Sequence, residues 1–101
     1  MCEDVAVSRN GKWLAVASKE IISLYDASTL DCLWSRDNQC EFISFSPDDC
    51  QLVSGHIGDG KLQLINVQTG NPVKFFNVGA DRAVFSDDGT RVISGELCIA
   101  L

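Results

Sequence analysis

The residues able to do chemistry are few and scattered along the chain. His56 is the only histidine among 101 residues, and a catalytic imidazole needs a nucleophile and an orienting acid within reach. It follows Gly55 in a segment that reads as a turn between two strands, so we expect a surface loop residue. There is no glycine-rich phosphate loop and no nucleophile elbow. The sequence therefore predicts neither an enzyme nor a bound cofactor.

Two acidic pairs, Asp48-Asp49 and Asp87-Asp88, look like fragments of cation-binding loops. A calcium loop needs a run of alternating oxygen ligands and a distal glutamate, which neither pair has. Both pairs lie where the chain is expected to reverse direction. Aspartate is favoured there because its carboxylate accepts hydrogen bonds from nearby backbone amides. We interpret both pairs as turn residues and expect no metal.

Cysteine thiols are a further potential source of chemistry. Their number is odd, no CxxC pair occurs, and a single histidine cannot complete a zinc site with them. We interpret them as reduced thiols of a cytoplasmic protein, with the nucleus as an alternative location. A disulfide between Cys32 and Cys40 is the competing interpretation. The cysteines are Cys2, Cys32, Cys40, Cys50 and Cys98.

The charge balance bears on the class of partner. The net charge is −6, from 14 acidic and 8 basic residues. No cluster of lysine and arginine gives the electrostatic footprint of a nucleic-acid or anionic-membrane surface. No apolar run approaches the roughly 20 residues of a membrane helix, and no secretory leader is recognisable. We therefore expect neither nucleic acid nor membrane as a partner.

The elements that position these residues repeat along the chain. Ser8, Ser46 and Ser86 are equivalent in three segments that align without a gap, with spacings of 38 and 40 residues. In each segment a turn signal follows the serine, and a short apolar run of strand length follows the turn. Helical periodicity is absent. The segments are VAVSRNGKWLAVAS (5–18), ISFSPDDCQLVSGH (43–56) and AVFSDDGTRVISGE (83–96).

A period of about 40 residues with several short strands per copy is typical of β-propeller blades. At this point the chain resembles the WD40 repeat family. The resemblance implies an all-β fold, a partial β-propeller of four-stranded antiparallel blades, two complete (4–37 and 41–77) and one incomplete (82–101). The matching motifs are Phe45-Ser46-Pro47-Asp48, Leu52-Val53-Ser54-Gly55, Asp59-Gly60, Leu64-Ile65-Asn66 and Val67-Gln68-Thr69-Gly70.

The chain also departs from the family pattern. The Trp-Asp dipeptide is replaced by Tyr25-Asp26 and by Ile65-Asn66, and the Gly-His pair before a blade's first strand is absent. Of the hydrogen-bond network that pins a blade in this family, only Ser54 and Asp59 fit as structural residues. We therefore expect the blades to be held together mainly by apolar packing. Trp13 and Trp34 have two interpretations, as packing between blades or as anchors for a partner.

The function that the resemblance implies is a protein–protein interaction scaffold, with binding surfaces on the top and bottom loops of the blades. About two and a half blades cannot close a ring of typically four to eight, and open strand edges invite association. We therefore expect other proteins as partners, together with the remaining blades of a larger parent propeller or further copies of the chain. A truncated non-functional gene product and a substrate-gating propeller piece of an enzyme are the alternatives. The loop candidates for protein binding are Arg9, Asn10, Lys19, Glu20, Asp37, Asn38, His56, Asp81 and Arg82.

Overall fold

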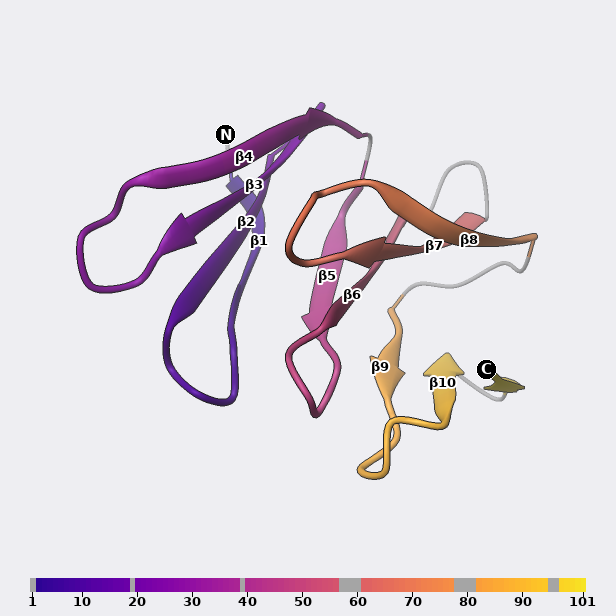
Figure 1. Ribbon diagram of the computed structural model, residues 1–101. Coiled ribbons are helices and arrows are strands. Elements are labelled where there is room, and N and C mark those ends of the chain that lie inside the picture. Colours follow the sequence, from indigo (N-terminus) through magenta and orange to yellow (C-terminus); the bar gives the residue numbers. More distant parts are fainter. Residues whose placement is uncertain (1, 19, 39, 57–60, 78–81, 95–96) are drawn as a thin grey trace.

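The computed structural model describes residues 2–18, 20–38, 40–56, 61–77, 82–94 and 97–101 (Figure 1). Regular structure within these ranges consists of β-strands alone, and no helix among them is long and apolar enough to cross a membrane. The strands are β1 (Cys2–Val7), β2 (Trp13–Ser18), β3 (Ile21–Asp26), β4 (Cys32–Asp37), β5 (Phe42–Phe45), β6 (Gln51–His56), β7 (Lys61–Asn66), β8 (Pro72–Asn77), β9 (Val84–Phe85), β10 (Arg91–Ser94) and β11 (Leu97–Ala100).

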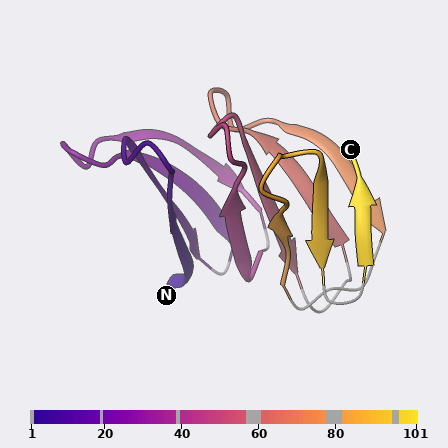
Figure 2. The same cartoon turned by 90° about the horizontal axis from the view of Figure 1, so that it is seen from below.

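These strands form three antiparallel sheets in which each strand pairs with its neighbours in sequence. The first sheet has the order β1-β2-β3-β4, the second β5-β6-β7-β8, and the third β9-β10-β11. Figure 2 shows the three sheets side by side. The predicted all-β fold of two complete four-stranded blades and one incomplete blade is confirmed.

The strand register repeats as faithfully as the sequence does. The pair Val7↔Leu14 of the first sheet has the equivalents Phe45↔Leu52 in the second and Phe85↔Val92 in the third. A register shift between the third and fourth strands also recurs, at Leu24/Tyr25 and at Leu64/Ile65. Because one residue of slip would move every side chain to the other face, a common register gives each blade the same inner and outer faces.

Two apolar clusters fill the spaces between the sheets. The first cluster joins the first and second sheets and comprises Ala15, Ala17, Ile22, Leu24, Trp34, Cys40, Ile43, Phe45, Leu52, Ile65 and Val67. The second cluster joins the second and third sheets and comprises Phe42, Val53, Leu62, Leu64, Ala83, Phe85 and Val92. The second sheet is thus buried on both faces, which explains why Leu64 and Ile65 are adjacent in sequence and both buried.

Trp34 belongs to the first cluster, so the packing interpretation of this residue is confirmed. Its ring lies over Gly70, where a Cβ atom would approach the indole to 2.6 Å. Its Nε1 donates a hydrogen bond of 2.6 Å to the carbonyl oxygen of Val67. A buried indole normally needs such a partner for its N–H group, and here the partner belongs to the neighbouring blade.

Two sequence-based expectations need correction. His56 is the last residue of β6 and pairs with Lys61 of β7, so its backbone lies in a strand and not in a turn, because the strand pairing extends past Gly55. Cys32 and Cys40 are both free, the first exposed and the second buried. The alternative of a disulfide between them is therefore wrong.

Candidate functional site

One end of the molecule is formed by three equivalent turns, 8–12, 46–50 and 86–90, which we call the turn end. Each turn joins the first two strands of a sheet, and Figure 1 shows the three in a row along its lower side. In each one a serine hydroxyl donates to the Asx side chain two residues later, at 2.6, 2.6 and 2.7 Å. The same serine oxygen accepts the N–H of the first residue of the following strand. The three turns therefore share one pattern of internal hydrogen bonds.

These hydrogen bonds keep the turn carboxylates ionised. Hydrogen bonds from the Ser46 hydroxyl and the Cys50 amide lower the pKa of Asp48 below its ordinary value. The Thr90 amide, with the Ser86 and Thr90 hydroxyls, lowers the pKa of Asp88 to about 2. Hydrogen bonds that are made to the charged form favour that form. The turn end therefore carries fixed negative charge.

Asp49 has a role that the sequence did not reveal. Its carboxylate accepts the backbone N–H of Arg9 at 2.8 Å and that of Asn10 at 3.0 Å, across the junction of the first and second sheets. The residue is 6% exposed and has a φ of 61°, in the left-handed region that favours glycine. The equivalent residues, Gly11 and Gly89, are indeed glycines. We call the two hydrogen bonds from the Arg9 and Asn10 amides to the Asp49 carboxylate the clasp. An aspartate where the other two copies have glycine was the sequence signal that could have revealed it.

The clasp is one of several polar contacts between the first and second sheets. Arg36 donates to the carbonyl of Thr69 at 2.6 Å, and Asn38 donates from Nδ2 to Oε1 of Gln63 at 2.8 Å. These bonds come from side chains outside the family network, and they add to the apolar packing that is expected to be the main contact between the blades.

The candidates at the opposite end of the blades do not form one site with those at the turn end. Arg9 and Asn10 belong to the turn end, whereas Glu20 and Asp37 are exposed where the strands of the first sheet end on the other side. Asn38 is partly buried by its contact with Gln63. Lys19, Asp59 and Asp81 lie outside the described residues, as does the side chain of His56.

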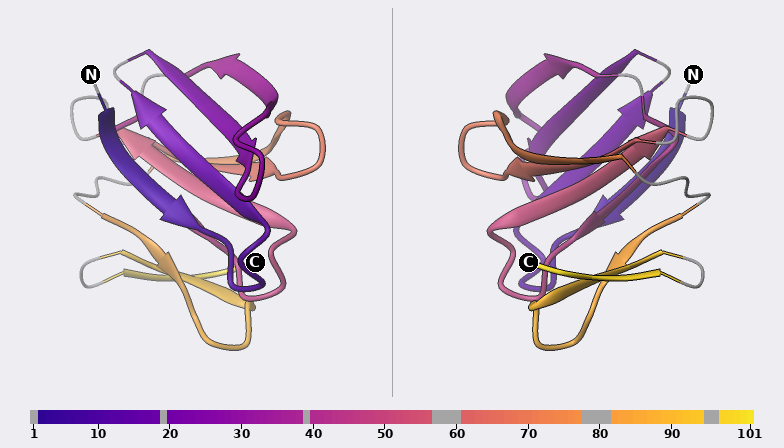
Figure 3. Two further views of the ribbon diagram at one scale, coloured as in Figure 1. Left: turned by 90° about the vertical axis from the view of Figure 1, so that its left-hand side faces the viewer. Right: turned by 90° about the vertical axis from the view of Figure 1, so that its right-hand side faces the viewer.

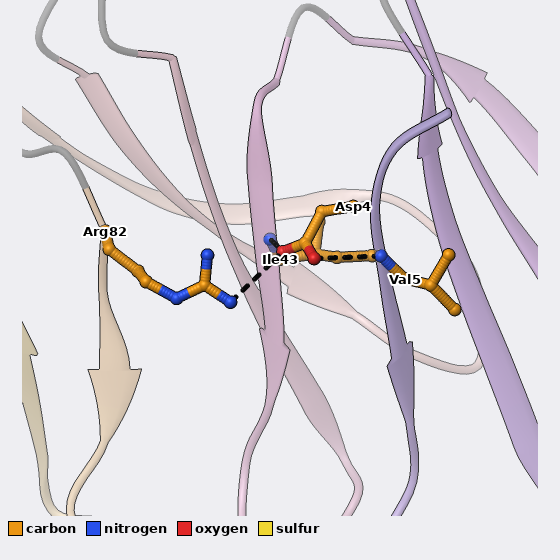
Figure 4. Close-up of polar contacts among 4 residues, drawn as sticks. All are labelled: Asp4, Val5, Ile43 and Arg82. Atoms are coloured by element: carbon orange, nitrogen blue, oxygen red, sulfur yellow. Dashed lines mark hydrogen bonds and ion pairs between the residues drawn. The ribbon is translucent and has the colours of Figure 1, made fainter. Parts of the chain in front are cut away.

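Arg82 is tied to the innermost strands. Its Nη2 lies 3.7 Å from Oδ2 of Asp4, which also accepts the Ile43 N–H at 3.0 Å (Figure 4). The other carboxylate oxygen of Asp4 accepts the Val5 N–H at 2.9 Å. Asp4 thus links the first two sheets to the segment that precedes β9. Arg82 is still 67% exposed, so it remains accessible at the surface.

Ser54 was predicted to be a structural residue together with Asp59. Its side chain is 1% exposed, and its hydroxyl has no hydrogen-bond partner among the described residues.

Among those same residues, no group of three or more His, Cys, Asp and Glu side chains could hold a metal ion.

Comparison with known proteins starts from the sequence. No family model matches the chain. The chain is 28% identical over 100 residues to the uncharacterized WD repeat-containing protein sll1491 of Synechocystis sp.. The alignment covers 93% of this chain and 29% of the relative, so the chain spans less than a third of that protein's length.

Solved structures with the same fold cover a similar fraction of their own chains. Hydrazine synthase of Kuenenia stuttgartiensis superposes with a TM-score of 0.83 at 18% identity, over 90% of this chain and 28% of that chain. The RRP9 WD40 repeats give 0.81 at 14%, over 92% and 32%. A chain of the mitotic checkpoint complex gives 0.76 at 17%, over 89% and 30%. Taken with the repeat in the sequence and the common register of its sheets, these similarities support the resemblance of the chain to WD repeat proteins.

Proposed function

We propose that this chain is a protein–protein interaction scaffold that binds partner proteins through the turns of its blades. The observation that supports this most is the contrast within the turn end. The three turns share their internal hydrogen bonds, yet several of their exposed side chains differ. Lys12, Cys50 and Thr90 occupy equivalent exposed positions. A rigid, repeated frame that carries variable side chains is suited to specific recognition.

The charges at the turn end favour a basic partner segment. Asp48, Asp87 and Asp88 are exposed on the second and third turns, and the whole chain has a net charge of −6. Arg9 and Lys12 place two cations on the first turn, so the basic segment of the partner lies over the other two. Complementary charge raises association rates and excludes partners of the wrong sign.

The other end of the blades supplies a second candidate surface, as the top and bottom loops of a propeller would. Its described residues in this proposal are Glu20, Asp37, Asn38 and Arg82. Lys19, His56 and Asp81 stay part of the proposal on the sequence alone. The protein complex named for one structural relative, the mitotic checkpoint complex, supports protein partners in general. Hydrazine synthase is named as an enzyme, but a likeness at 18% identity concerns the fold alone. We place the chain in the cytoplasm, in keeping with its free cysteines.

A binding assay with charge-neutral variants tests this proposal. The probe is a lysine-rich peptide of about 15 residues, with a glutamate-rich peptide of equal length for comparison. We expect the lysine-rich peptide to bind and Asp87→Asn to weaken it several-fold, because one exposed charge contributes at most about 1 kcal/mol. Asp87 suits this test because its side chain is exposed and the internal bonds of the turn use Asp88 instead.

The matched control is Asp37→Asn, which removes the same charge at the opposite end. This variant should leave binding of the lysine-rich peptide unchanged. Equal weakening by both variants would mean that the peptide senses only net charge, and preferential binding of the glutamate-rich peptide would refute the acidic surface.

A further inference from the structure

The second sheet ends at its outer side with β8, which pairs with β7 and with no further strand of the described chain. A strand at the edge of a sheet turns about half of its backbone N–H and C=O groups away from its neighbour. The blades contact each other through their faces, as the two apolar clusters show, so a neighbouring blade leaves this edge open. Figure 3 shows β8, drawn in orange, between β4 and the third sheet.

Two large apolar side chains lie exposed on this edge strand. Phe75 is 63% exposed and Val73 is 54% exposed, and neither belongs to the two apolar clusters. Phe75 pairs with Gln63 of β7, whose side chain accepts a hydrogen bond from Asn38. Because directly paired residues share a face of the sheet, Phe75 lies on the face turned towards the first sheet. Aromatic side chains are enriched in protein interfaces, so this edge has the composition of a contact surface.

Lys74 lies on the opposite face of β8, since successive side chains of a strand alternate. Its Nζ is 5.4 Å from the centre of the Phe76 ring, and Phe76 packs against the second apolar cluster. Among the described residues, no carboxylate forms an ion pair with Lys74. Opposite charges that face each other across two strands stabilise the pairing. The Lys74 cation is therefore suited to a carboxylate on an adjoining strand.

The equivalent outer strand of the first sheet, β4, lacks this pattern. Ser35 is the equivalent of Phe75, because it pairs with Ser23 as Phe75 pairs with Gln63. Arg36 and Asp37 place charges of both signs on β4, which is a common protection of edge strands. Of the two outer edges, β8 is thus the one suited to binding, and β4 supplies an internal control.

We propose that an extended segment of a partner protein adds a strand to the outer edge of β8, with apolar side chains on the Phe75 face and an acidic side chain on the Lys74 face. Such strand addition takes its affinity from main-chain hydrogen bonds and its specificity from alternate side chains. A second copy of this chain is the rival occupant, but β8 contains no aspartate or glutamate to place against Lys74. This surface is separate from the turn end, so the inference does not depend on the partner proposed above.

Fluorescence anisotropy of a labelled nine-residue peptide, in which valines alternate with Thr, Glu, Glu and Thr, tests this inference on the purified chain. One face of this peptide is apolar and the other acidic when it is extended. We expect saturable binding below about 1 mM. Phe75→Ser, which installs the residue of β4, should weaken binding at least about fivefold. The matched control, Leu33→Ser, changes a 50% exposed side chain of β4 and should leave binding unchanged.

A charge reversal gives a sharper result. The comparison peptide has lysine in place of both glutamates, and the measured quantity is the ratio of the two affinities. Lys74→Glu should shift this ratio by about fivefold towards the lysine peptide. Asp87→Asn should leave binding of the glutamate peptide unchanged, which separates this surface from the turn end. Lys74→Glu also decides the question if Phe75→Ser fails to fold, as judged by circular dichroism.

Hydrogen exchange shows whether a strand is added. The glutamate peptide should slow exchange at amides of β8 and leave those of β4 unchanged, because an added strand accepts hydrogen bonds from the edge amides. Replacing the central valine of the peptide with proline should abolish this protection and the binding, because proline has no N–H group to pair.

Five outcomes would overturn this inference. The first is the absence of binding at about 1 mM peptide. The second is equal weakening by Phe75→Ser and Leu33→Ser, and the third is an affinity ratio that Lys74→Glu leaves unchanged, either of which would place the peptide elsewhere. The fourth is undiminished binding of the proline peptide, which would mean that no strand is added. The fifth is a dimer in sedimentation that Phe75→Ser dissociates, which would make a second copy the occupant of β8.

Discussion

The two junctions between the sheets solve the same packing problem in different ways. At the first junction, between the first and second sheets, the clasp from Asp49 reaches the amides of Arg9 and Asn10. At the second junction, between the second and third sheets, the two donor positions are Pro47, which has no N–H group, and Asp48, which keeps one, and the acceptor position is Gly89, which has no carboxylate. A Cβ on Gly89 would lie 3.5 Å from Cδ of Pro47, an ordinary van der Waals distance, so the two turns are neighbours here as well. The same repeat position thus forms a polar contact at the first junction and has no side chain to form one at the second.

The largest expected effect compares one aromatic residue from each junction. Trp34→Ala and Phe85→Ala each remove a buried ring, which typically costs about 3–5 kcal/mol of unfolding free energy. Trp34→Ala also leaves the carbonyl of Val67 without its hydrogen bond, so we expect it to cost about 1 kcal/mol more. Urea unfolding of both variants measures the difference. Equal losses would show that the indole hydrogen bond adds no net stability.

The next effect concerns glycines that lie under those rings. Gly70 lies under Trp34 at the first junction and Gly55 under Phe42 at the second, and an added Cβ would overlap either ring. Each alanine substitution should cost about 1–3 kcal/mol because the ring must move. Gly70→Ala should cost about 1 kcal/mol more than Gly55→Ala, since Gly70 alone has a left-handed φ, of 77°. Thermal melts of the two variants, compared with Gly11→Ala, whose added Cβ would meet no atom within 4 Å at a φ of 73°, provide the ranking.

Two substitutions test the clasp: Asp49→Ala removes it from the first junction, and Gly89→Asp places a carboxylate at the equivalent position of the second. Asp49→Ala should cost about 2 kcal/mol, because it removes a charged acceptor from two backbone donors. Gly89→Asp should also destabilise, by about 1 kcal/mol, because aspartate at a φ of 74° is strained and only one of the two donor positions, Asp48, has an N–H group, the other being Pro47. Chemical denaturation of both variants tests this pair. A stabilising Gly89→Asp would show that the second junction can accept a clasp after all.

The repeat explains why most of the fold could be predicted from the sequence. Strand pairs such as Phe45↔Leu52 follow from alternation between turn signals, and equivalent serines fixed the alignment of the copies. The clasp could not be predicted, because Asp49 bonds to residues about 40 positions away and a turn explains an aspartate equally well. His56 was assigned to a turn because Gly55 suggested a strand end, whereas this glycine makes room for Phe42.

The binding residues were less accessible to sequence reasoning. Loop positions such as Arg9 and Glu20 were chosen because the family binds through its loops, and the structure places these two at opposite ends of the first sheet. Asn38 looked like a free loop residue but bonds to Gln63 of the next blade. Contacts between blades depend on how the sheets are set against each other, which no local pattern records.

A smaller effect concerns the response of the third turn to acid, through the carboxylate of Asp88. The pKa of Asp88 is lowered to about 2, chiefly by the Thr90 amide. A lowered pKa means that the hydrogen bonds of this carboxylate contribute fully above its ordinary pKa near 4 and are lost as the pH falls towards 2. The protection of the Thr90 amide, which is the slowing of its exchange relative to that of an unstructured amide at the same pH, should therefore fall over that range. Asp88→Asn should abolish this change in protection, and an unchanged protection profile in this variant would point to another group.

The smallest expected effect is a change in the labelling rate of the Cys40 thiol when either junction is altered. Cys40 is 1% exposed within the first junction, and its burial, with the nearby charges of Asp4 and Glu3, raises its pKa to about 11. The thiolate is the reactive form, so at pH 8 Cys40 should react with iodoacetamide far more slowly than exposed Cys32, Cys50 and Cys98. Asp49→Ala should accelerate only the labelling of Cys40, because it loosens the junction that covers this thiol. If Gly89→Asp accelerates Cys40 as much, the two junctions open together and the polar clasp does not act locally.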